Sequence, residues 1–234
     1  FGSWKPDRQS TTPLIPEPSL ANYGGVFFVS LPLLNQSYIQ MGHMGGQVDS
    51  PDYPELSVLN GVMNGFGGRL FNSIRSEKGL AYSVYGYWSA AYDYPGVFIA
   101  GGQTRSDATV EFIKAIETEL EKIRQAPPSA EEIAYAKDST LNSFIFNFED
   151  PAQTLSRLMR YEYFSYPEDF IFQYRREVEA TTAADVQRVA QQYLNPDKMV
   201  TLVVGSESAI EPPLTSLTDT QQVTSIDITI PQSS

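Results

Sequence analysis

The stretch GGRLFNSIRSEKGLAY, residues 67–82, decides the fold because it contains a helix, the end of that helix and the start of a strand. Apolar residues recur at helical spacing over 69–78, which predicts a helix there. Gly79 is suited to the left-handed backbone conformation that ends many helices. Tyr82 then opens an aromatic run typical of a strand. The sequence therefore predicts a tight corner with Arg75 before it and Tyr82 after it.

The flanking segments predict paired strands. Short runs at 25–32 and 37–44 have the apolar or alternating character of strands, and apolar residues at helical spacing over 52–64 predict a helix after them. After the corner, runs at 82–91 and 96–102 are separated by a turn and predict an antiparallel hairpin. Strands therefore come in pairs on both sides of the helical segment.

Helices dominate the second half of the chain. Capping residues, prolines and apolar periodicity predict helices at about 110–123, 129–146, 151–166, 168–178 and 182–193, a buried strand at 199–204 and an alternating run at 223–230. This order predicts an α+β fold of two layers, in which helices cover an antiparallel or mixed sheet. Glu117, Glu119 and Glu121 are expected on the solvent side of the apolar stripe at 110–123, where solvation explains them without a catalytic role.

Composition excludes several classes of function. The chain of 234 residues has a formal net charge of −12, and such a surface repels phosphate, so we expect neither nucleic-acid binding nor attraction to an anionic membrane. It has no cysteine, which excludes disulfides, thiolate metal sites and cysteine nucleophiles. No stretch approaches the ~20 apolar residues of a membrane span. With 41% hydrophobic residues, the chain can bury a sizeable core.

The histidine count limits the chemistry further. His43 is the only histidine, and neither H-E-x-x-H nor H-x-x-E-H occurs, so we expect no catalytic zinc on this chain by itself. A serine triad would depend on His43 alone and lacks a G-x-S-x-G motif. The glycine loop at 65–68 does not match a phosphate-binding pattern and is expected to be a corner between helices.

Two features leave both a structural and a functional reading open. The aromatic run YSVYGYWSAAY, residues 82–92, could bind peptide or could simply pack within the sheet. Arg75 lies in the last helical turn, where a cation complements the helix dipole, and a tyrosine at the start of a strand is common. The residues alone therefore do not decide the role of Arg75 and Tyr82.

The stretch GGRLFNSIRSEKGLAYSVY strongly resembles a segment of the pitrilysin-type zinc peptidases, the group that includes insulin-degrading enzyme, the mitochondrial processing peptidase and the core subunits of the cytochrome bc1 complex. NQSYIQMGHMG before it, SAEEIAYAKDSTLNSFIF after it and VQRVAQQYLNPDKMVTLVVG near the end resemble the same family in the same order. The resemblance covers about residues 20–205. Arg75, Gly79, Leu80, Ala81 and Tyr82 fill the R-x-x-x-[GQ]-L-[AG]-Y signature of the family.

The resemblance implies a role for this chain. Family members pair homologous domains as two halves of a clamshell, and the zinc half carries H-x-x-E-H and a distal glutamate. The partner half lacks them and carries the signature found here. This chain therefore resembles the non-zinc half, with zinc held by a homologous domain or subunit and an extended peptide as substrate. The resemblance implies that Arg75 and Tyr82 bind the substrate backbone.

The prolines of the first twenty residues and the extent of the resemblance together predict the organisation of the chain. Residues 1–20 are expected to be a linker or the end of a preceding domain, 21–205 the peptidase-type domain, and 206–234 a tail with a possible edge strand. Because residue 1 is Phe, we expect a fragment or a processed product. A purely structural subunit, like the bc1 core proteins, and a peptide-binding module without chemistry remain alternatives. The compartment is open, with the periplasm or cell envelope suggested by bacterial relatives.

Overall fold

A computed structural model of the chain describes residues 16, 18, 24–65, 67–219 and 222–229. Within these residues, one mixed sheet has the strand order β3-β4-β2-β5-β1-β6. Its first four strands pair antiparallel, whereas β1 pairs parallel with β5 and β6. The strands are β1 Val26–Ser30, β2 Gln36–Met44, β3 Ala81–Ser89, β4 Val97–Arg105, β5 Val200–Gly205 and β6 Thr224–Ser225.

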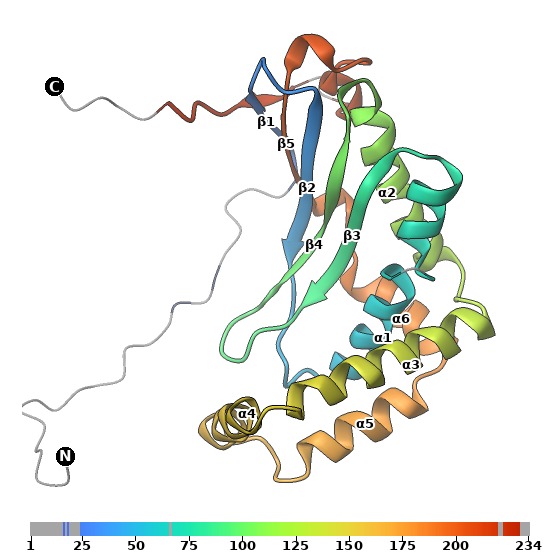
Figure 1. Cartoon of the computed structure of the whole chain (residues 1–234), viewed down its shortest axis with the longest axis vertical. Coiled ribbons are helices and arrows are strands. Elements are labelled where there is room, and N and C mark those ends of the chain that lie inside the picture. The colour runs from blue at the N-terminus through green and yellow to red at the C-terminus, as the bar shows by residue number, and fades with distance from the viewer. Residues whose placement is uncertain (1–15, 17, 19–23, 66, 220–221, 230–234) are drawn as a thin grey trace, which may run out of the picture.

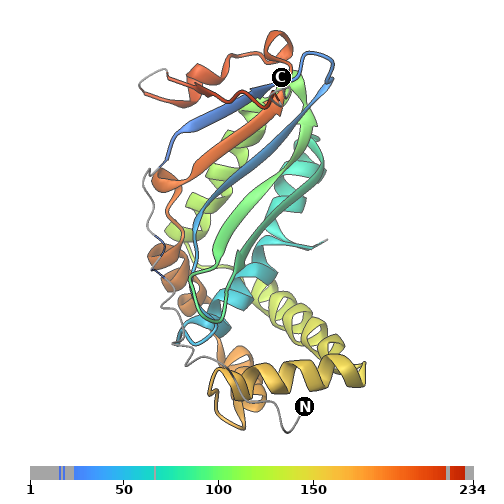
Figure 2. The same ribbon diagram turned by 90° about the vertical axis from the view of Figure 1, so that its left-hand side faces the viewer.

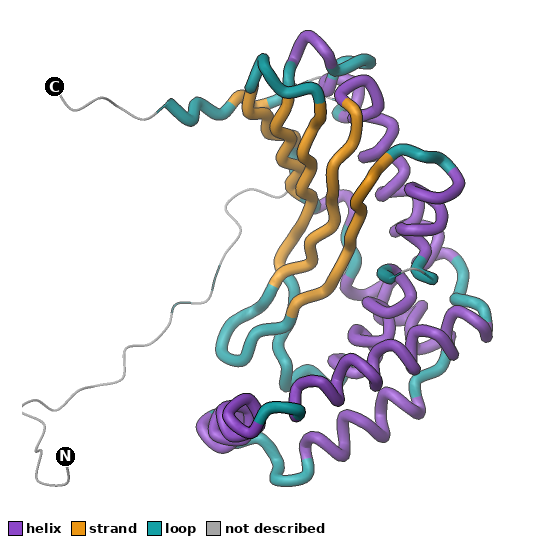
Figure 3. Tube along the Cα trace, in the orientation of Figure 1, coloured by secondary structure: helices purple, strands orange, loops and turns teal. Residues whose placement is uncertain are grey.

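Some of the helices lie on one face of this sheet, and the others lie beyond the end of the β3–β4 hairpin (Figure 1). Coloured by secondary structure, the chain separates into a layer of strands and a layer of helices (Figure 3). The predicted α+β fold, a mixed sheet covered by helices, is thereby confirmed. The helical segments are α1 Tyr53–Met63, the π-helix η1 Phe71–Glu77, α2 Thr109–Gln125, α3 Ala130–Ile145, α4 Pro151–Tyr163, α5 Phe170–Ala180 and α6 Ala183–Tyr193. No helix in the described ranges is long and apolar enough to cross a membrane.

The core lies between the two layers, and strand alternation shows which side chains enter it. On β2, Ile39 and Met41 are fully buried under the helices. Tyr38 points to the opposite face of the sheet and is 42% exposed. Viewed from that side, the strands face the viewer with the helices behind them (Figure 2). The aromatic hairpin divides in the same way: Trp88 packs into the core, and Tyr87 on the open face is 42% exposed.

Local sequence signals account for the helix ends. Ser129 and Glu132 form the predicted capping box of α3, and Thr182 and Asp185 form that of α6. Asp150 caps α4 by accepting hydrogen bonds from two backbone N–H groups of the first turn. These interactions satisfy N–H groups that a helix leaves without partners at its start.

The structure differs from the sequence-based expectations in the type and bounds of some elements. The helix predicted over 69–78 is a π-helix rather than an α-helix, and strand β4 continues to Arg105 instead of ending at 102. Of the run at 223–230, Thr224 and Ser225 pair with β1 at the sheet edge, and position 230 lies outside the described residues. Most of the segment 1–20, with its predicted linker, also lies outside them.

Candidate functional site

The corner between η1 and β3 is built on Gly79. Its φ of +63° lies in the left-handed region, and a Cβ at this position would meet nothing within 4 Å. Glycine is therefore needed for its backbone conformation and not for lack of space. The Gly79 N–H donates to the Arg75 carbonyl oxygen at 3.2 Å, and the Leu80 N–H donates to the Ile74 carbonyl oxygen at 3.0 Å. These bonds close the helix at the position predicted from the sequence.

Strand β3 begins with an irregularity that includes Tyr82. Ala81 lies opposite Thr104 and Ser83 lies opposite Gln103, so Tyr82 is the extra residue of a β-bulge. Its side chain is 79% exposed. The buried Thr104 hydroxyl donates to the Leu80 carbonyl oxygen at 2.5 Å and holds the start of the strand in place. The bulge therefore directs Tyr82 away from the core, while its neighbour Ala81 stays buried.

Arg75 and Tyr82 meet at this corner. The Arg75 guanidinium carbon lies 5.0 Å from the centre of the Tyr82 ring and 4.8 Å from the centre of the Phe71 ring. Both distances are in the range of cation–π contacts. Among the described residues, no carboxylate forms an ion pair with Arg75. The structure thus brings the two predicted site residues together, partly exposed, with the guanidinium donors not used by an acid.

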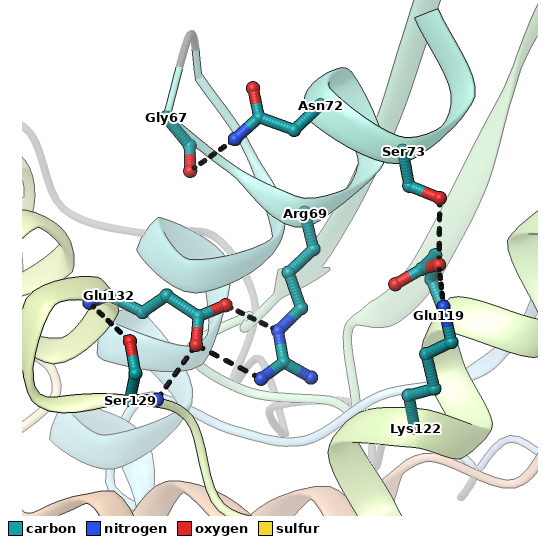
Figure 4. A network of polar contacts seen from close by, with 8 residues as sticks. All are labelled: Gly67, Arg69, Asn72, Ser73, Glu119, Lys122, Ser129 and Glu132. Carbon is teal, nitrogen blue, oxygen red and sulfur yellow. Dashed lines mark hydrogen bonds and ion pairs between the residues drawn. The ribbon is translucent and has the colours of Figure 1, made fainter. Parts of the chain in front are cut away.

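A polar network anchors the segment to the helices beside it (Figure 4). Arg69 forms two parallel hydrogen bonds to Glu132 of α3, with Nε–Oε1 at 2.6 Å and Nη2–Oε2 at 3.1 Å. The Ser73 hydroxyl donates to Glu119 of α2 at 2.8 Å, and Lys122 Nζ approaches the same carboxylate oxygen at 2.7 Å. These contacts fix η1 against two helices of the outer layer, which limits movement of the Arg75 backbone.

The network overturns one expectation about the carboxylates. Glu119 was expected on the solvent side of α2, but only 4% of it is exposed. The error arises because η1 packs over this part of α2 and brings Ser73 to the carboxylate, a contact that helical periodicity cannot reveal. Glu119 has structural partners in Ser73 and Lys122.

The glycine loop at 65–68 is explained by close backbone approach. A Cβ at Gly68 would lie 2.2 Å from the Asn64 carbonyl oxygen, so only glycine fits where the chain turns from α1 into η1. Asn72 and Gly67 add a hydrogen bond of 3.2 Å across the turn. The expected corner between helices is confirmed at these positions.

Asn60 of α1 and Asn64, which follows the end of α1, close part of the free edge of the sheet. Strand β3 is an edge strand, and its outward backbone groups at Gly86 and Trp88 bind side-chain amides instead of another strand. Asn60 accepts from the Trp88 N–H at 2.6 Å and donates to the Trp88 carbonyl oxygen at 2.8 Å. Asn64 makes the equivalent pair of bonds to Gly86. The amides thus occupy an edge to which a peptide strand could otherwise be added.

His43 is a structural residue. Its ring is 9% exposed and stacks on Phe98 with ring centres 5.3 Å apart. Nδ1 lies 2.7 Å from the Met44 carbonyl oxygen, and Nε2 accepts from the Asn195 N–H at 3.3 Å. Burial lowers the pKa of His43 below its usual value, which favours the neutral ring. Both nitrogens are occupied, and the described residues contain no cluster of three potential metal ligands.

The residues present therefore do not fit a zinc ion. Zinc needs several histidine, cysteine or carboxylate ligands directed at one point. Two glutamates lie near the corner, the buried Glu119 and the half-buried Glu132, and each is already paired with a cation. What the corner offers is different: one guanidinium and one phenol hydroxyl on a rigid backbone. Such a pair can donate hydrogen bonds to carbonyl oxygens of a peptide.

Comparison with known proteins gives one family match. The model described as the peptidase M16 inactive domain matches residues 1–140. Among curated proteins, the chain is 26% identical over 169 residues to the uncharacterized zinc protease YmxG of Bacillus subtilis, a match that covers 72% of this chain. The chain spans 41% of the length of that relative and 30% of a similar zinc protease of Streptomyces coelicolor.

Solved structures show the same fold. The peptidase M16 inactive domain from Pseudomonas fluorescens superposes with a TM-score of 0.76 at 24% identity, covering 85% of this chain and 47% of that one. A protease from Helicobacter pylori superposes with a TM-score of 0.73 at 19% identity, covering 88% of this chain and 50% of that one. In both cases about half of the other chain lies outside the match.

Proposed function

The chain belongs to the peptidase M16 inactive-domain family. On that premise we propose that it is the peptide-binding half of a metallopeptidase whose zinc is held by a companion domain. The companion is a homologous domain or subunit that carries the H-x-x-E-H motif, which this chain lacks. The relatives are named zinc proteases, so the family supplies the reaction class, peptide hydrolysis. The contribution of this chain is argued from its own residues.

The observation that carries the proposal is the guanidinium of Arg75, which has no acidic partner among the described residues and lies over the exposed Tyr82 ring. An arginine on a protein surface is commonly satisfied by a nearby acid in a chain as acidic as this one. Arg75 instead rests on two aromatic rings, which orient the guanidinium without using its N–H donors. Its donors therefore remain available to a ligand.

Two irregular elements present the pair, and both kinds of irregularity are frequent at functional sites. Arg75 lies in a π-helix, and Tyr82 is the extra residue of a β-bulge. Each irregularity costs some regular hydrogen bonding. We infer that this cost is retained because it aims the two side chains toward a common point outside the fold.

Arg75 and Tyr82 have complementary roles toward a peptide. The planar guanidinium donates from a fixed fork to backbone carbonyl oxygens and favours a carbonyl oxygen that gains negative charge during hydrolysis. The Tyr82 hydroxyl adds a donor on a rigid arm. Donors placed at a developing oxyanion lower a barrier by roughly 3 kcal/mol each. Because the gripping groups and the zinc lie on different halves, hydrolysis requires the halves to close on the substrate.

The edge of β3 supports an extended peptide bound by the companion. Asn60 and Asn64 occupy the outward backbone groups of Trp88 and Gly86, so a peptide cannot add as a strand at these positions. We infer that strand addition takes place on the companion, and that this chain contacts the bound peptide through Arg75 and Tyr82. We also propose 21–205 as the limits of the folded peptidase-type domain, with 206–234 as its tail.

A three-part assay tests the proposed function. Peptide cleavage is measured with this chain alone, with the zinc-bearing M16 companion from the same organism alone, and with both. We expect cleavage only in the mixture. A companion that is fully active without this chain would favour the structural-subunit alternative, and tight peptide binding by this chain alone without any cleavage in the mixture would favour the peptide-binding alternative.

A further inference from the structure

Helix α4 turns its apolar stripe away from the protein. Within Pro151–Tyr163, all of which the structure describes, Tyr161 is the buried side chain. Leu155, Leu158, Met159 and Tyr163 recur at helical spacing and are 59%, 47%, 63% and 80% exposed. We call these four residues the α4 patch. A surface helix normally buries such a stripe, as α2 does with Ile116, Leu120 and Ile123.

The inner side of α4 is held by Tyr161 and by two arginines. The Arg160 guanidinium carbon lies 5.2 Å from the centre of the Tyr92 ring in the β3–β4 hairpin. The Arg157 guanidinium carbon lies 5.6 Å from the centre of the Phe148 ring. Arg157 Nη2 also donates to Asn147 Oδ1 at 2.7 Å. Tyr161 packs its ring against Phe170, with ring centres 5.0 Å apart, so the helix is docked by this buried tyrosine together with the arginine contacts. These contacts fix the orientation of α4, and the α4 patch therefore faces away from the rest of the chain.

Further apolar side chains surround this feature. Ile145 and Phe146, where α3 ends, are 61% and 62% exposed, and the turn Phe146–Phe148 packs against α4. Several large exposed apolar side chains on adjoining elements are typical of a protein–protein interface. In Figure 1, α4 lies beyond the end of the β3–β4 hairpin, where it can meet another domain without covering the sheet.

We propose that the α4 patch is the surface on which the companion domain docks. Relatives supply the reason for this choice of occupant: more than half of the length of the curated relatives, and about half of the P. fluorescens and H. pylori chains, lies outside the part that this chain matches. A companion of similar size is therefore available to cover the patch. The patch contains no charged residue, so its complement is an apolar surface.

The α4 patch lies far from Arg75 and Tyr82, the residues proposed to bind peptide. Strand β3 starts beside Tyr82 and runs for nine residues toward the hairpin that contacts α4 through Tyr92. At ~3.3 Å per residue the strand spans roughly 30 Å. One end of the strand therefore carries the groups proposed to bind peptide, and the other end carries the docking helix. A peptide bound at Arg75 does not need the α4 patch, whereas a companion domain can reach both.

This inference rests on the proposed function, and its test separates the two. The full chain with Leu158→Glu and Met159→Glu is mixed with the zinc-bearing companion, and association is measured by analytical ultracentrifugation. We expect the Kd to rise at least tenfold, with the thermal midpoint of the variant unchanged because both side chains are exposed. Leu33→Glu is the matched control, since Leu33 is fully exposed at the other end of the sheet, and it should leave the Kd unchanged.

Each outcome decides between the possibilities. Unchanged association of the α4 double variant overturns the inference. A homodimer of this chain that the double variant dissociates also overturns it, because the occupant is then a second copy. Weakened association together with cleavage that recovers at saturating companion supports it. If the double variant weakens association but no mixture cleaves peptide, the docking surface stands and the proposed function fails.

Discussion

Arg69 and Arg75 lie six positions apart in the same segment, yet the structure uses them in opposite ways. Arg69 points inward to Glu132, and its side chain is 17% exposed. Arg75 points outward, rests on Phe71 and Tyr82, and has no acidic partner among the described residues. The first arginine holds the segment to the helical layer. The second is held by the segment.

The comparison teaches that a shared residue type does not imply a shared role. A half-buried bidentate ion pair contributes to stability and is already satisfied. A guanidinium supported only by rings remains able to bind a carbonyl or carboxylate group from outside. Substitutions at the two positions should therefore separate stability from activity.

The largest effect is expected from Arg75→Ala. In the mixture with the companion, kcat/KM should fall about 100-fold, or roughly 2.7 kcal/mol, because the fixed donors to the peptide are lost. The free energy of unfolding should change by no more than about 1 kcal/mol, the size of exposed cation–π contacts. The zinc content of the companion should stay constant. Full activity of this variant would remove the proposed role of Arg75.

Arg69→Ala should produce the opposite pattern. Removing Arg69 leaves Glu132 half-buried without its cation, which should cost about 2 kcal/mol of unfolding free energy, between the values for exposed and buried pairs. Chemical denaturation measures this loss. Arg105→Ala is the control, since the Arg105–Asp107 pair is largely exposed and should contribute little. Activity per folded molecule should be retained, and a loss as large as that of Arg75→Ala would erase the distinction between the arginines.

Tyr82→Phe should have a smaller effect than Arg75→Ala. The ring that supports Arg75 remains, and only the hydroxyl donor is removed, so we expect kcat/KM to fall about tenfold, or roughly 1.4 kcal/mol. Steady-state kinetics of the assembled enzyme measures this change. If Tyr82 serves only as a platform for the guanidinium, the phenylalanine variant will be as active as the unaltered protein.

The smallest effect is expected in the pH dependence of stability. The hydrogen bonds from Arg69 lower the pKa of Glu132 in the folded state below its usual value of 4.5. The pair therefore stabilises the fold fully above that value, and this contribution is lost as the pH falls below it. The difference in unfolding free energy between the unaltered chain and Arg69→Ala should shrink in acid. If this difference stays constant down to pH 3, the Arg69–Glu132 ion pair is not the cause of the stability lost in Arg69→Ala.

Much of the fold follows from local sequence signals. Strand alternation on either side of the corner, the two capping boxes and Gly79 predicted the layer of strands and the helix ends, because each depends on residues close in sequence. The proximity of Arg75 and Tyr82 also followed, since a tight turn joins their elements. The role of this pair came from the family resemblance and remains a prediction.

The rest depends on contacts between distant segments. The π-helix and the bulge need the packing of η1 against α2 and β3, which no periodicity reports. Asn60 of α1 and Asn64 just after it are ordinary polar positions in the sequence, and only the fold brings β3 beside them. The outward stripe of α4 has the pattern of a buried helix, and its direction depends on contacts of Tyr161, Arg157 and Arg160 with other segments.

Photo-crosslinking tests the central claim most directly. A photoreactive p-benzoylphenylalanine is placed at position 82 in one sample and at position 163 in another, because Tyr82 and Tyr163 are equally exposed at 79% and 80%. Each chain is mixed with the companion and a peptide substrate, irradiated, and the adducts are identified by mass. We expect the peptide to be captured at position 82 and not at position 163. Peptide captured at neither position, or equally at both, while the mixture cleaves it would contradict the account.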